Sequence, residues 1–445
     1  MADPRLLRLI IRLGVPAIFG LSANAINQFI DALWITRLSP VAMAAIGVTF
    51  PVFIVVMAAT AGIGVACAGE IGRRLGRKDV DGAQNIALTA FFVAIGISAF
   101  VALVVGAMSL SILPQIGASA ETFPMAQRYM LVLLCAVPMA SFQIISDFVA
   151  LGSGNSKRSM QSLFACFGLN MLLDPIFIFG FGWGVTGAAL ATVAGQILAC
   201  TLYIVWFRNG TLGLRPLKGH HSRENLNVLL RFSPPVAMVN LLMALSFLLL
   251  ISATARLADD IYLAALTFEL RLASLIIIPM RGLSLGAQAA VSHAYGALDE
   301  LRANRLIHRI FALSIGLGLA MTALILMVGP ALLPSLIPAP AMREASAAMF
   351  PYFAAFIIGS CAYIPLLAGF QATDRALYAA IVALAPNGYA MVPLVIFLPM
   401  IWGFQGLLFA VALSGVVTAL IAGGLHIMSL SRISTTLSPA PAETP

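Results

Sequence analysis

The run ALTAFFVAIGISAFVALVVGA, residues 87–107, contains no charged side chain. A transmembrane helix needs about 20 consecutive, mostly apolar residues, and runs of this length recur from Leu6 to the end of the chain. A transmembrane β-barrel would instead show short segments that alternate between apolar and polar residues. Because no such alternation is present, the sequence predicts an all-α polytopic membrane protein.

The composition supports this class. Of the 445 residues, 61% are hydrophobic and only 9% are charged, whereas soluble domains carry roughly 25% charged residues. A soluble globular protein is therefore excluded. The five cysteines all lie in apolar runs without the spacing of a metal site, so we expect them to be buried, and we expect no metal site or cofactor. They are Cys67, Cys135, Cys166, Cys200 and Cys361.

Charged joints and joints rich in Gly or Pro divide the chain into twelve predicted spans. Their approximate limits are 10–36, 42–70, 84–113, 125–151, 159–181, 185–207, 228–256, 261–292, 303–333, 343–371, 377–400 and 404–430. Lys and Arg are retained on the cytoplasmic side of membrane proteins. With these spans, nineteen basic residues fall on one side and four on the other, while Arg271 and Arg281 fall within a span. We therefore expect both termini in the cytoplasm, and the net charge of +8 requires no nucleic acid partner.

The two halves of the chain share a pattern in which equivalent residue numbers differ by a nearly constant 219. Arg12-Leu-Gly-Val-Pro16 matches Arg231-Phe-Ser-Pro-Pro235, and Gly184 and Gly187 match Gly403 and Gly406. Chance matching of small residues is the alternative explanation, but the offset hardly varies over separated blocks. The repeat predicts two pseudo-symmetric six-helix lobes, 1–207 and 228–432, joined by a cytoplasmic linker, 208–227, and followed by a disordered tail, 433–445.

Polar residues on two predicted spans mark a candidate site. An ionisable side chain at mid-membrane costs at least about 2.5 kcal/mol, so each one needs a function or a partner. Asp31 ends a stripe on one helix face that also contains Asn24, Asn27 and Gln28. Asn170 and Asp174 likewise share a face of the fifth span, at positions i and i+4.

Helix geometry places several of these residues at one depth. With 1.5 Å of rise per residue, Asp31, Asp174 and Thr192 lie roughly 9 to 12 Å below the outer surface, and Tyr129 is slightly shallower. Such oxygen atoms could hold a proton or a hard cation such as Na⁺. A hydrogen-bond network that only ties the helices together is the alternative. The second half favours a function, because the equivalents of Asn24 and Asp31 at an offset of 219 are Met243 and Leu250.

Four further ionisable residues lie within predicted spans and keep open interpretations. Glu269, Arg271 and Arg281 could pair with other helices, or Arg271 and Arg281 could extend toward the membrane surface, or all three could line a cavity in the second lobe. The i,i+2 spacing argues against a direct bridge between Glu269 and Arg271. Asp147 could line the cavity from the first lobe or pair with a cytoplasmic basic residue.

Three motifs resemble the multidrug and toxic compound extrusion (MATE) family. They are Gly152-Ser-Gly-Asn-Ser-Lys157, the run Gly168-Leu-Asn170-Met-Leu-Leu-Asp174-Pro175-Ile-Phe, and the segment from Gly182 to Thr192. The second motif is the most specific, and the resemblance covers nearly the whole chain. It implies a secondary antiporter of twelve helices in two lobes, which expels organic, often cationic, compounds in exchange for H⁺ or Na⁺.

The resemblance also assigns roles to residues. It places the proton or cation site at Asp31, Asn170, Asp174 and Thr192, with Tyr129 in the same network, and it matches Pro16 to a proline at which the first helix bends. NorM-like members also carry carboxylates in spans seven and ten, whereas here span seven has none and span ten has only Glu344 at its outer end, with Asp374 in the following loop. The chain is therefore more similar to the DinF-like branch.

We expect alternating access between the lobes, with Pro16 and Pro175 as points where a helix can bend. The expected substrate-binding residues are Gln28, Asn24, Asn27, Asp147, Met43 and Phe53. A flippase for a lipid-linked anionic head group is the main alternative, and a membrane enzyme lacks any supporting motif. We expect a monomer in the cell inner membrane, surrounded by lipid, whose partners are small organic molecules.

Overall fold

The protein is almost entirely helical. The structure is a computed structural model, and it describes residues 4–216, 219–296, 299–373 and 375–436. Its elements are α1 (Pro4–Leu38), α2 (Pro40–Gly76), α3 (Val80–Ala107), α4 (Ser109–Ile116), α5 (Phe123–Gly152), α6 (Ser156–Pro175), the π-helical turn η1 (Ile176–Gly180), α7 (Gly184–Asn209), α8 (Arg223–Phe232), α9 (Pro234–Leu257), α10 (Asp260–Gly296), α11 (Glu300–Leu336), α12 (Pro340–Ala372), α13 (Ala376–Leu384) and α14 (Met391–Thr436).

Twelve helical spans follow from these elements. Among the described residues, ten helices are long and apolar enough to cross a membrane, and the last of them is α14. The backbone of α14 is broken at Gly403, so its first part, together with α13, forms the predicted span 377–400, and the remainder forms the predicted span 404–430. With α1 added, the predicted class, an all-α polytopic membrane protein, is confirmed.

Three predicted spans differ from the observed helices. The span 84–113 is interrupted at Met108, where α3 gives way to α4. The span 228–256 begins later than predicted, because α8 ends at Phe232 and Pro234, which has no backbone N–H, starts a new helix. The span 377–400 is interrupted after α13 by the turn that contains Pro386, Asn387 and Gly388, three residue types that favour turns.

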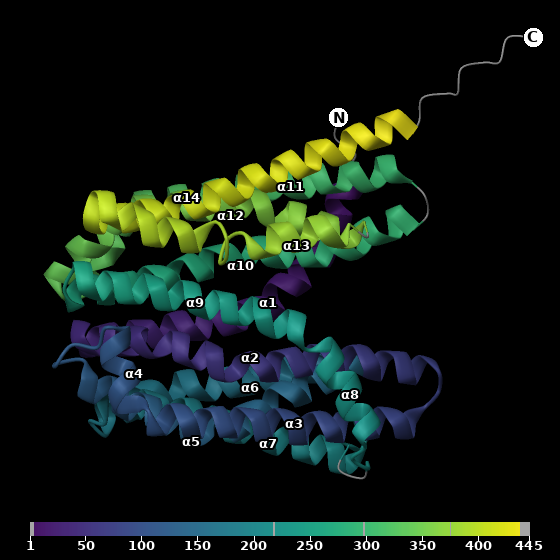
Figure 1. Ribbon diagram of the computed structural model, residues 1–445, viewed down its shortest axis with the longest axis horizontal. Helices are drawn as coiled ribbons and strands as arrows, with labels where there is room; N and C mark the ends of the chain where they lie inside the picture. Colours follow the sequence, from purple (N-terminus) through teal and green to yellow (C-terminus); the bar gives the residue numbers. More distant parts are fainter. Residues whose placement is uncertain (1–3, 217–218, 297–298, 374, 437–445) are drawn as a thin grey trace, which may run out of the picture. The chain divides into compact units, whose positions relative to one another are not determined.

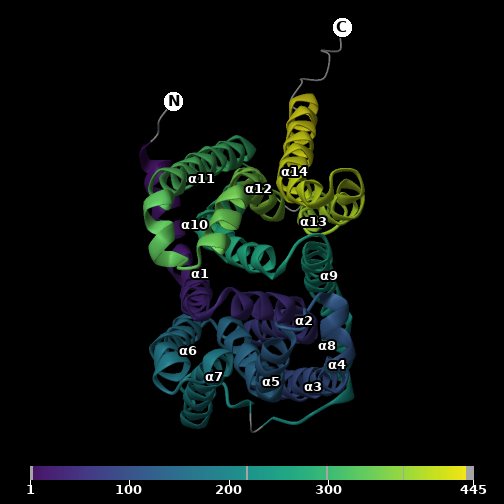
Figure 2. The ribbon, with the colours of Figure 1, turned by 90° about the vertical axis from the view of Figure 1, so that its left-hand side faces the viewer.

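The chain forms two compact units. One comprises residues 23–272 and 330–349, and the other comprises residues 1–22, 273–329 and 350–445. In the first unit, α2 packs against α3, α5 and α9, while α7 packs against α5 and α6. Figure 2 shows these helices end-on, with α6, α7, α5 and α3 following one another below α2, and Figure 1 shows them from the side.

Hydroxyl groups join helices inside the first unit. Ser141 of α5 is fully buried and lies 2.6 Å from the hydroxyl of Ser98 on α3 and 3.2 Å from that of Thr60 on α2. In a membrane span an unpaired hydroxyl has no water to bond, so mutual bonding lets three adjacent helices pack closely.

Close helix contacts in the second unit depend on glycine. A Cβ atom on Gly359 of α12 would lie 2.4 Å from the backbone carbon of Gly415 on α14. A Cβ atom on Gly318 of α11 would lie 2.2 Å from the sulfur of Cys361. Small residues at such contacts let backbones approach closely where the hydrophobic effect cannot drive association.

The internal repeat is visible in the backbone of each half. Gly184 and Gly403 both have positive φ angles, 54° and 55°, which glycine adopts without strain. Three residues later, a Cβ atom on Gly187 would lie 2.6 Å from a backbone carbonyl oxygen of the preceding segment, and one on Gly406 would lie 2.2 Å from another. The offset found in the sequence therefore relates equivalent turns, as predicted.

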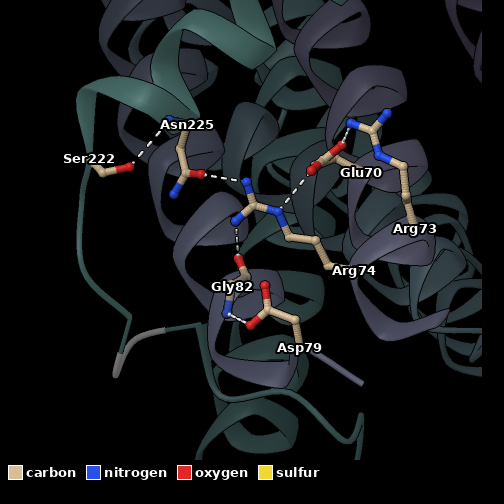
Figure 3. A network of polar contacts seen from close by, with 7 residues as sticks. All are labelled: Glu70, Arg73, Arg74, Asp79, Gly82, Ser222 and Asn225. Atoms are coloured by element: carbon tan, nitrogen blue, oxygen red, sulfur yellow. Dashed lines mark hydrogen bonds and ion pairs between the residues drawn. The ribbon is translucent and has the colours of Figure 1, made fainter. Parts of the chain in front are cut away.

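A polar network attaches α8 to the end of α2 (Figure 3). Arg74 donates to Glu70 at 2.8 Å, to the backbone oxygen of Gly82 at 2.8 Å and to the side-chain oxygen of Asn225 at 2.7 Å. Arg73 also bonds Glu70. Asn225 lies in the first turn of α8, where its backbone N–H donates to Ser222. One arginine thus joins α2, the start of α3 and α8.

Replacing Arg74 with alanine should therefore loosen α8 and lower the melting temperature. The change removes three hydrogen bonds, and each bond to a charged group contributes about 1.5 to 3 kcal/mol. Amide hydrogen exchange of Arg223–Phe232 should become faster. Arg73→Ala is the control, since the Arg73 side chain is 48% exposed and should contribute less than about 1 kcal/mol. Equal exchange in the two variants would contradict this role of Arg74.

Candidate functional site: a buried carboxylate cluster on α1 and α6

Asp174 and Asn170 form the part of the site that lies on α6. Both side chains are buried, and Asp174 is fully enclosed. The Asn170 amide donates to Asp174 Oδ1 at 3.0 Å and to the Thr192 hydroxyl on α7 at 3.5 Å. Thr192 in turn donates to the backbone oxygen of Ala188 at 3.1 Å. The structure therefore brings together three of the predicted site residues, from two neighbouring helices.

The helix that carries Asp174 changes character directly after it. Pro175 ends α6, and the next residues form the π-helical turn η1, in which the N–H of Phe181 donates to the oxygen of Ile176 at 2.9 Å. Proline cannot supply the N–H that an α-helix needs, and π-turns often occur at functional sites. The predicted bending point at Pro175 thus coincides with a real change in the backbone. The side chain of Pro16 lies outside the described residues.

Asp31 carries the second carboxylate, on α1. It is 8% exposed, and its Oδ2 lies 3.6 Å from the Nη1 of Arg271 on α10. The same nitrogen donates to the backbone oxygen of Gln28 at 2.9 Å. Arg271 therefore contacts the polar stripe of α1 at two points, the side chain of Asp31 and the backbone oxygen of Gln28. This resolves the open interpretation of Arg271 in favour of an ion pair, with a partner that spacing alone does not identify.

Several buried oxygen atoms in this region lack a hydrogen-bond donor within the described part of the chain. Among the described residues, buried oxygens of Asn27, Asp31, Asn170 and Asp174 lack any partner. Asp31 and Asp174 interact electrostatically, and the ring contact between Trp34 and Phe179, at 6.1 Å, joins α1 to η1. Buried oxygens normally have a donor or a cation. These four atoms, with two carboxylates among them, therefore suit a proton or a hard cation. We call Asp31, Asn170 and Asp174 the carboxylate cluster.

Tyr129 and Phe53 lie beside the carboxylate cluster. Tyr129 is buried and lies within electrostatic range of Asp31, Asp174 and Arg271. The Phe53 ring meets the Tyr129 ring edge-on, with the centroids 6.4 Å apart. Phe53 is half-buried, so an aromatic face remains near the acidic residues.

The other residues predicted to bind substrate have different surroundings. Gln28 donates to Asn24 at 2.7 Å along the stripe of α1. Met43 is fully enclosed among neighbouring side chains. Asp147 accepts hydrogen bonds from Tyr203 on α7 and, at 3.2 Å, from Ser159 on α6. These partners are hydroxyl groups and not the basic residue that is one of the two expectations for Asp147, while its role in a substrate cavity stays a prediction.

Both halves of the chain match the profile of one protein family. The MatE family profile matches residues 16–176 and 235–397. The chain belongs to the MatE family. The starting points of the two matched segments, at positions 16 and 235, are related by the offset of the internal repeat. The carboxylate cluster lies on the first segment, and Arg271 lies on the second.

Curated relatives of this MatE protein include transporters of two kinds. The multidrug export protein MepA of Staphylococcus aureus is 28% identical over 239 residues, which is 53% of each chain. The FAD transporter of Shewanella oneidensis is 23% identical over 308 residues, or 67% of each chain. The match therefore spans about half the length of MepA, and neither name by itself assigns a substrate to this protein.

Solved structures show the same fold. A multidrug resistance MATE family transporter of the MOP superfamily, in an inward-facing conformation, superposes with a TM-score of 0.86 at 23% identity, over 95% of this chain and all of the other. An outward-facing structure described in the same words gives a TM-score of 0.75 at 24% identity, over 97% and 98% of the two chains. The two-lobe, twelve-helix fold is thereby confirmed, while the assignment to a DinF-like branch stays a prediction.

Proposed function

We propose that this MatE protein is a secondary antiporter, which exports organic, often cationic, compounds in exchange for H⁺, with Na⁺ as the alternative coupling ion. The observation that carries the proposal is the carboxylate cluster, with its unpartnered oxygens in a membrane-spanning region. The name of MepA, a multidrug export protein, supports the substrate class. The cell inner membrane, cytoplasmic termini and a monomeric state belong to the same proposal.

Arg271 gives the proposal a mechanism of coupling. Its guanidinium neutralises Asp31, so a proton or a cationic compound that binds Asp31 must compete with it. When neither a proton nor a cationic compound is bound to Asp31, the ion pair holds α1 against α10. Binding of a proton or of the compound breaks the ion pair. An antiporter must change conformation only when it is occupied, and this exchange of partners meets that requirement. Since Arg271 is already paired, it offers little support for a flippase of anionic head groups.

Aromatic and polar groups next to the cluster suit an organic cation. The faces of Phe53 and Tyr129 can attract a cation, which typically contributes about 0.5 to 2 kcal/mol. Gln28 and Asn24 offer an acceptor and donors on the same face of α1 as Asp31. The Phe53 and Tyr129 rings also favour compounds that carry aromatic rings.

Efflux measured under separate gradients tests the proposal and identifies the ion. Purified protein in liposomes should move a fluorescent cation against its gradient when a pH difference is imposed at equal Na⁺. A Na⁺ gradient at equal pH should give less than a tenth of that rate. A tenfold ratio corresponds to a free-energy difference of about 1.4 kcal/mol. Movement driven by Na⁺ alone would reverse the assignment of the ion. No movement with either gradient would overturn the antiporter.

A further inference from the structure

A second buried carboxyl group lies apart from the carboxylate cluster, on α10. Glu269 lies nine residues after Asp260, the first residue of α10, and thus about 14 Å along the helix axis. Its side chain is 2% exposed, and it accepts a hydrogen bond from Ser346, which lies on α12 and is 1% exposed. Both helices are long and apolar enough to span the membrane. The pair therefore lies within the membrane and not at its surface.

Glu269 has no counter-ion within the part of the chain that the structure describes. Among the described residues, ion pairs join Glu70 with Arg73 and Arg74, and Asp31 with Arg271, but none includes Glu269. Arg271 is only two positions away on the same helix, yet its side chain binds Asp31 and the Gln28 backbone. Residues two positions apart do not share a helix face. An ionised carboxylate here would be an unpaired charge in an apolar region, which costs several kcal/mol.

One oxygen of Glu269 lacks a hydrogen-bond donor among the residues described by the structure. Oε1 accepts from Ser346, whereas Oε2 is buried and has no partner among the described residues. A proton on Oε2 removes the unpaired charge and leaves the bond from Ser346 intact. A metal cation is a poor fit, because hard cations take about six oxygen ligands and this pair offers one carboxyl group and one hydroxyl. The described residues also contain no group of three acidic, His or Cys side chains that could hold a metal.

We propose that Glu269, positioned by Ser346, is a second proton-binding site of this protein, separate from the carboxylate cluster. The inference rests on the proposed antiport, in which α10 meets water during the cycle. One proton then binds at the carboxylate cluster and another at Glu269, so two protons enter for each monovalent cation that leaves. Transport becomes electrogenic, and a pH difference supports a steeper substrate gradient than a one-for-one exchange allows.

The gradient at which net transport stops measures the number of protons. Liposomes containing the full-length protein are given a pH difference of one unit, with the membrane potential held at zero by valinomycin and equal K⁺. The probe is ethidium, a permanent monovalent cation. With two protons exchanged, ethidium should reach a gradient of about 100-fold, and with one proton about tenfold, since each tenfold step corresponds to about 1.4 kcal/mol.

Glu269→Gln should lower that limiting gradient from about 100-fold to about tenfold while transport continues. Glu344→Gln is the matched control, because Glu344 is exposed at the start of α12 and should leave the gradient unchanged. A limiting gradient in Glu269→Gln equal to that of the wild type would overturn the second site. Asp31→Asn distinguishes the two proposals, because it should stop transport altogether; continued transport in that variant would contradict the antiport mechanism itself.

Chemical labelling covers the case in which Glu269→Gln does not fold. Dicyclohexylcarbodiimide reacts with protonated carboxyl groups in apolar surroundings, so the wild-type peptide that contains Glu269 should be modified, and modification should fall as the pH rises. Ser346→Ala removes the hydroxyl that supports the ionised form, so labelling should persist to higher pH. Absence of labelling at Glu269, or labelling that does not change with pH, would overturn the proposal.

Discussion

Asp174→Asn is expected to abolish exchange driven by a pH difference, with at least a tenfold loss of rate, while the protein still binds its substrate. The change keeps the shape of the side chain and the neighbouring Asn170, but it removes a fully buried carboxylate that can take up a proton. Loss of coupling by a factor of ten corresponds to about 1.4 kcal/mol. The measurements are efflux of a fluorescent cation from liposomes and equilibrium binding of the same compound.

The control for Asp174→Asn is Asp81→Asn, because Asp81 is exposed in the first turn of α3 and should not affect either measurement. Undiminished pH-driven exchange in Asp174→Asn would show that this carboxylate takes no part in coupling. Loss of both binding and transport would instead assign Asp174 to the substrate site.

Arg271→Gln is expected to make the protein leak protons in the absence of substrate. Without the guanidinium, α1 loses its ion pair and hydrogen bond to α10 when Asp31 is empty, so the empty protein can change conformation more easily and carry protons in one direction. A dye that reports internal pH should show dissipation of an imposed pH difference at least tenfold faster than in wild-type liposomes, equivalent to loss of roughly 1.4 kcal/mol of restraint.

The double variant Asp31→Asn with Arg271→Gln should leak less than Arg271→Gln alone, because it retains the loosened helices but lacks the Asp31 carboxylate as a proton acceptor. Arg271→Lys should leak less than Arg271→Gln, since lysine keeps the charge but not the forked geometry of arginine. A proton-tight Arg271→Gln variant, or a leak in the double variant as fast as in Arg271→Gln, would contradict the role of the ion pair.

Much of the fold follows from local properties of the sequence. Uninterrupted apolar runs predict the spans, and the repeat offset predicts that Gly184 and Gly403 occupy equivalent turns, as their φ angles confirm. The break at Met108 is harder to predict, because the apolar character continues across it. Arg231, Ser233 and Pro234, by contrast, mark the break after α8. Local composition indicates that a segment prefers the membrane but does not determine where its hydrogen-bond ladder is interrupted.

The contacts of the candidate site can likewise be predicted only in part from the sequence. Asn170 and Asp174 are one helical turn apart, and their spacing suffices to place them on one face. The partnership of Asp31 with Arg271 joins residues from opposite halves of the chain, and that of Glu269 with Ser346 joins two separate helices of the second half. Such pairs depend on how whole helices pack. The sequence therefore identifies which ionisable groups need a partner, while only the structure identifies the partners.

The short turn between η1 and α7 also constrains how the protein enters the membrane. Phe181, Gly182 and Trp183 alone connect the two, and Gly187 lies against the Phe177 carbonyl with no room for a side chain. Helices joined this closely must enter the bilayer together as a hairpin, because neither can leave the translocon while the other stays behind. A bulky residue at Gly187 would therefore hinder formation of this hairpin, and the amount of protein found in the membrane should fall before any transport step is affected.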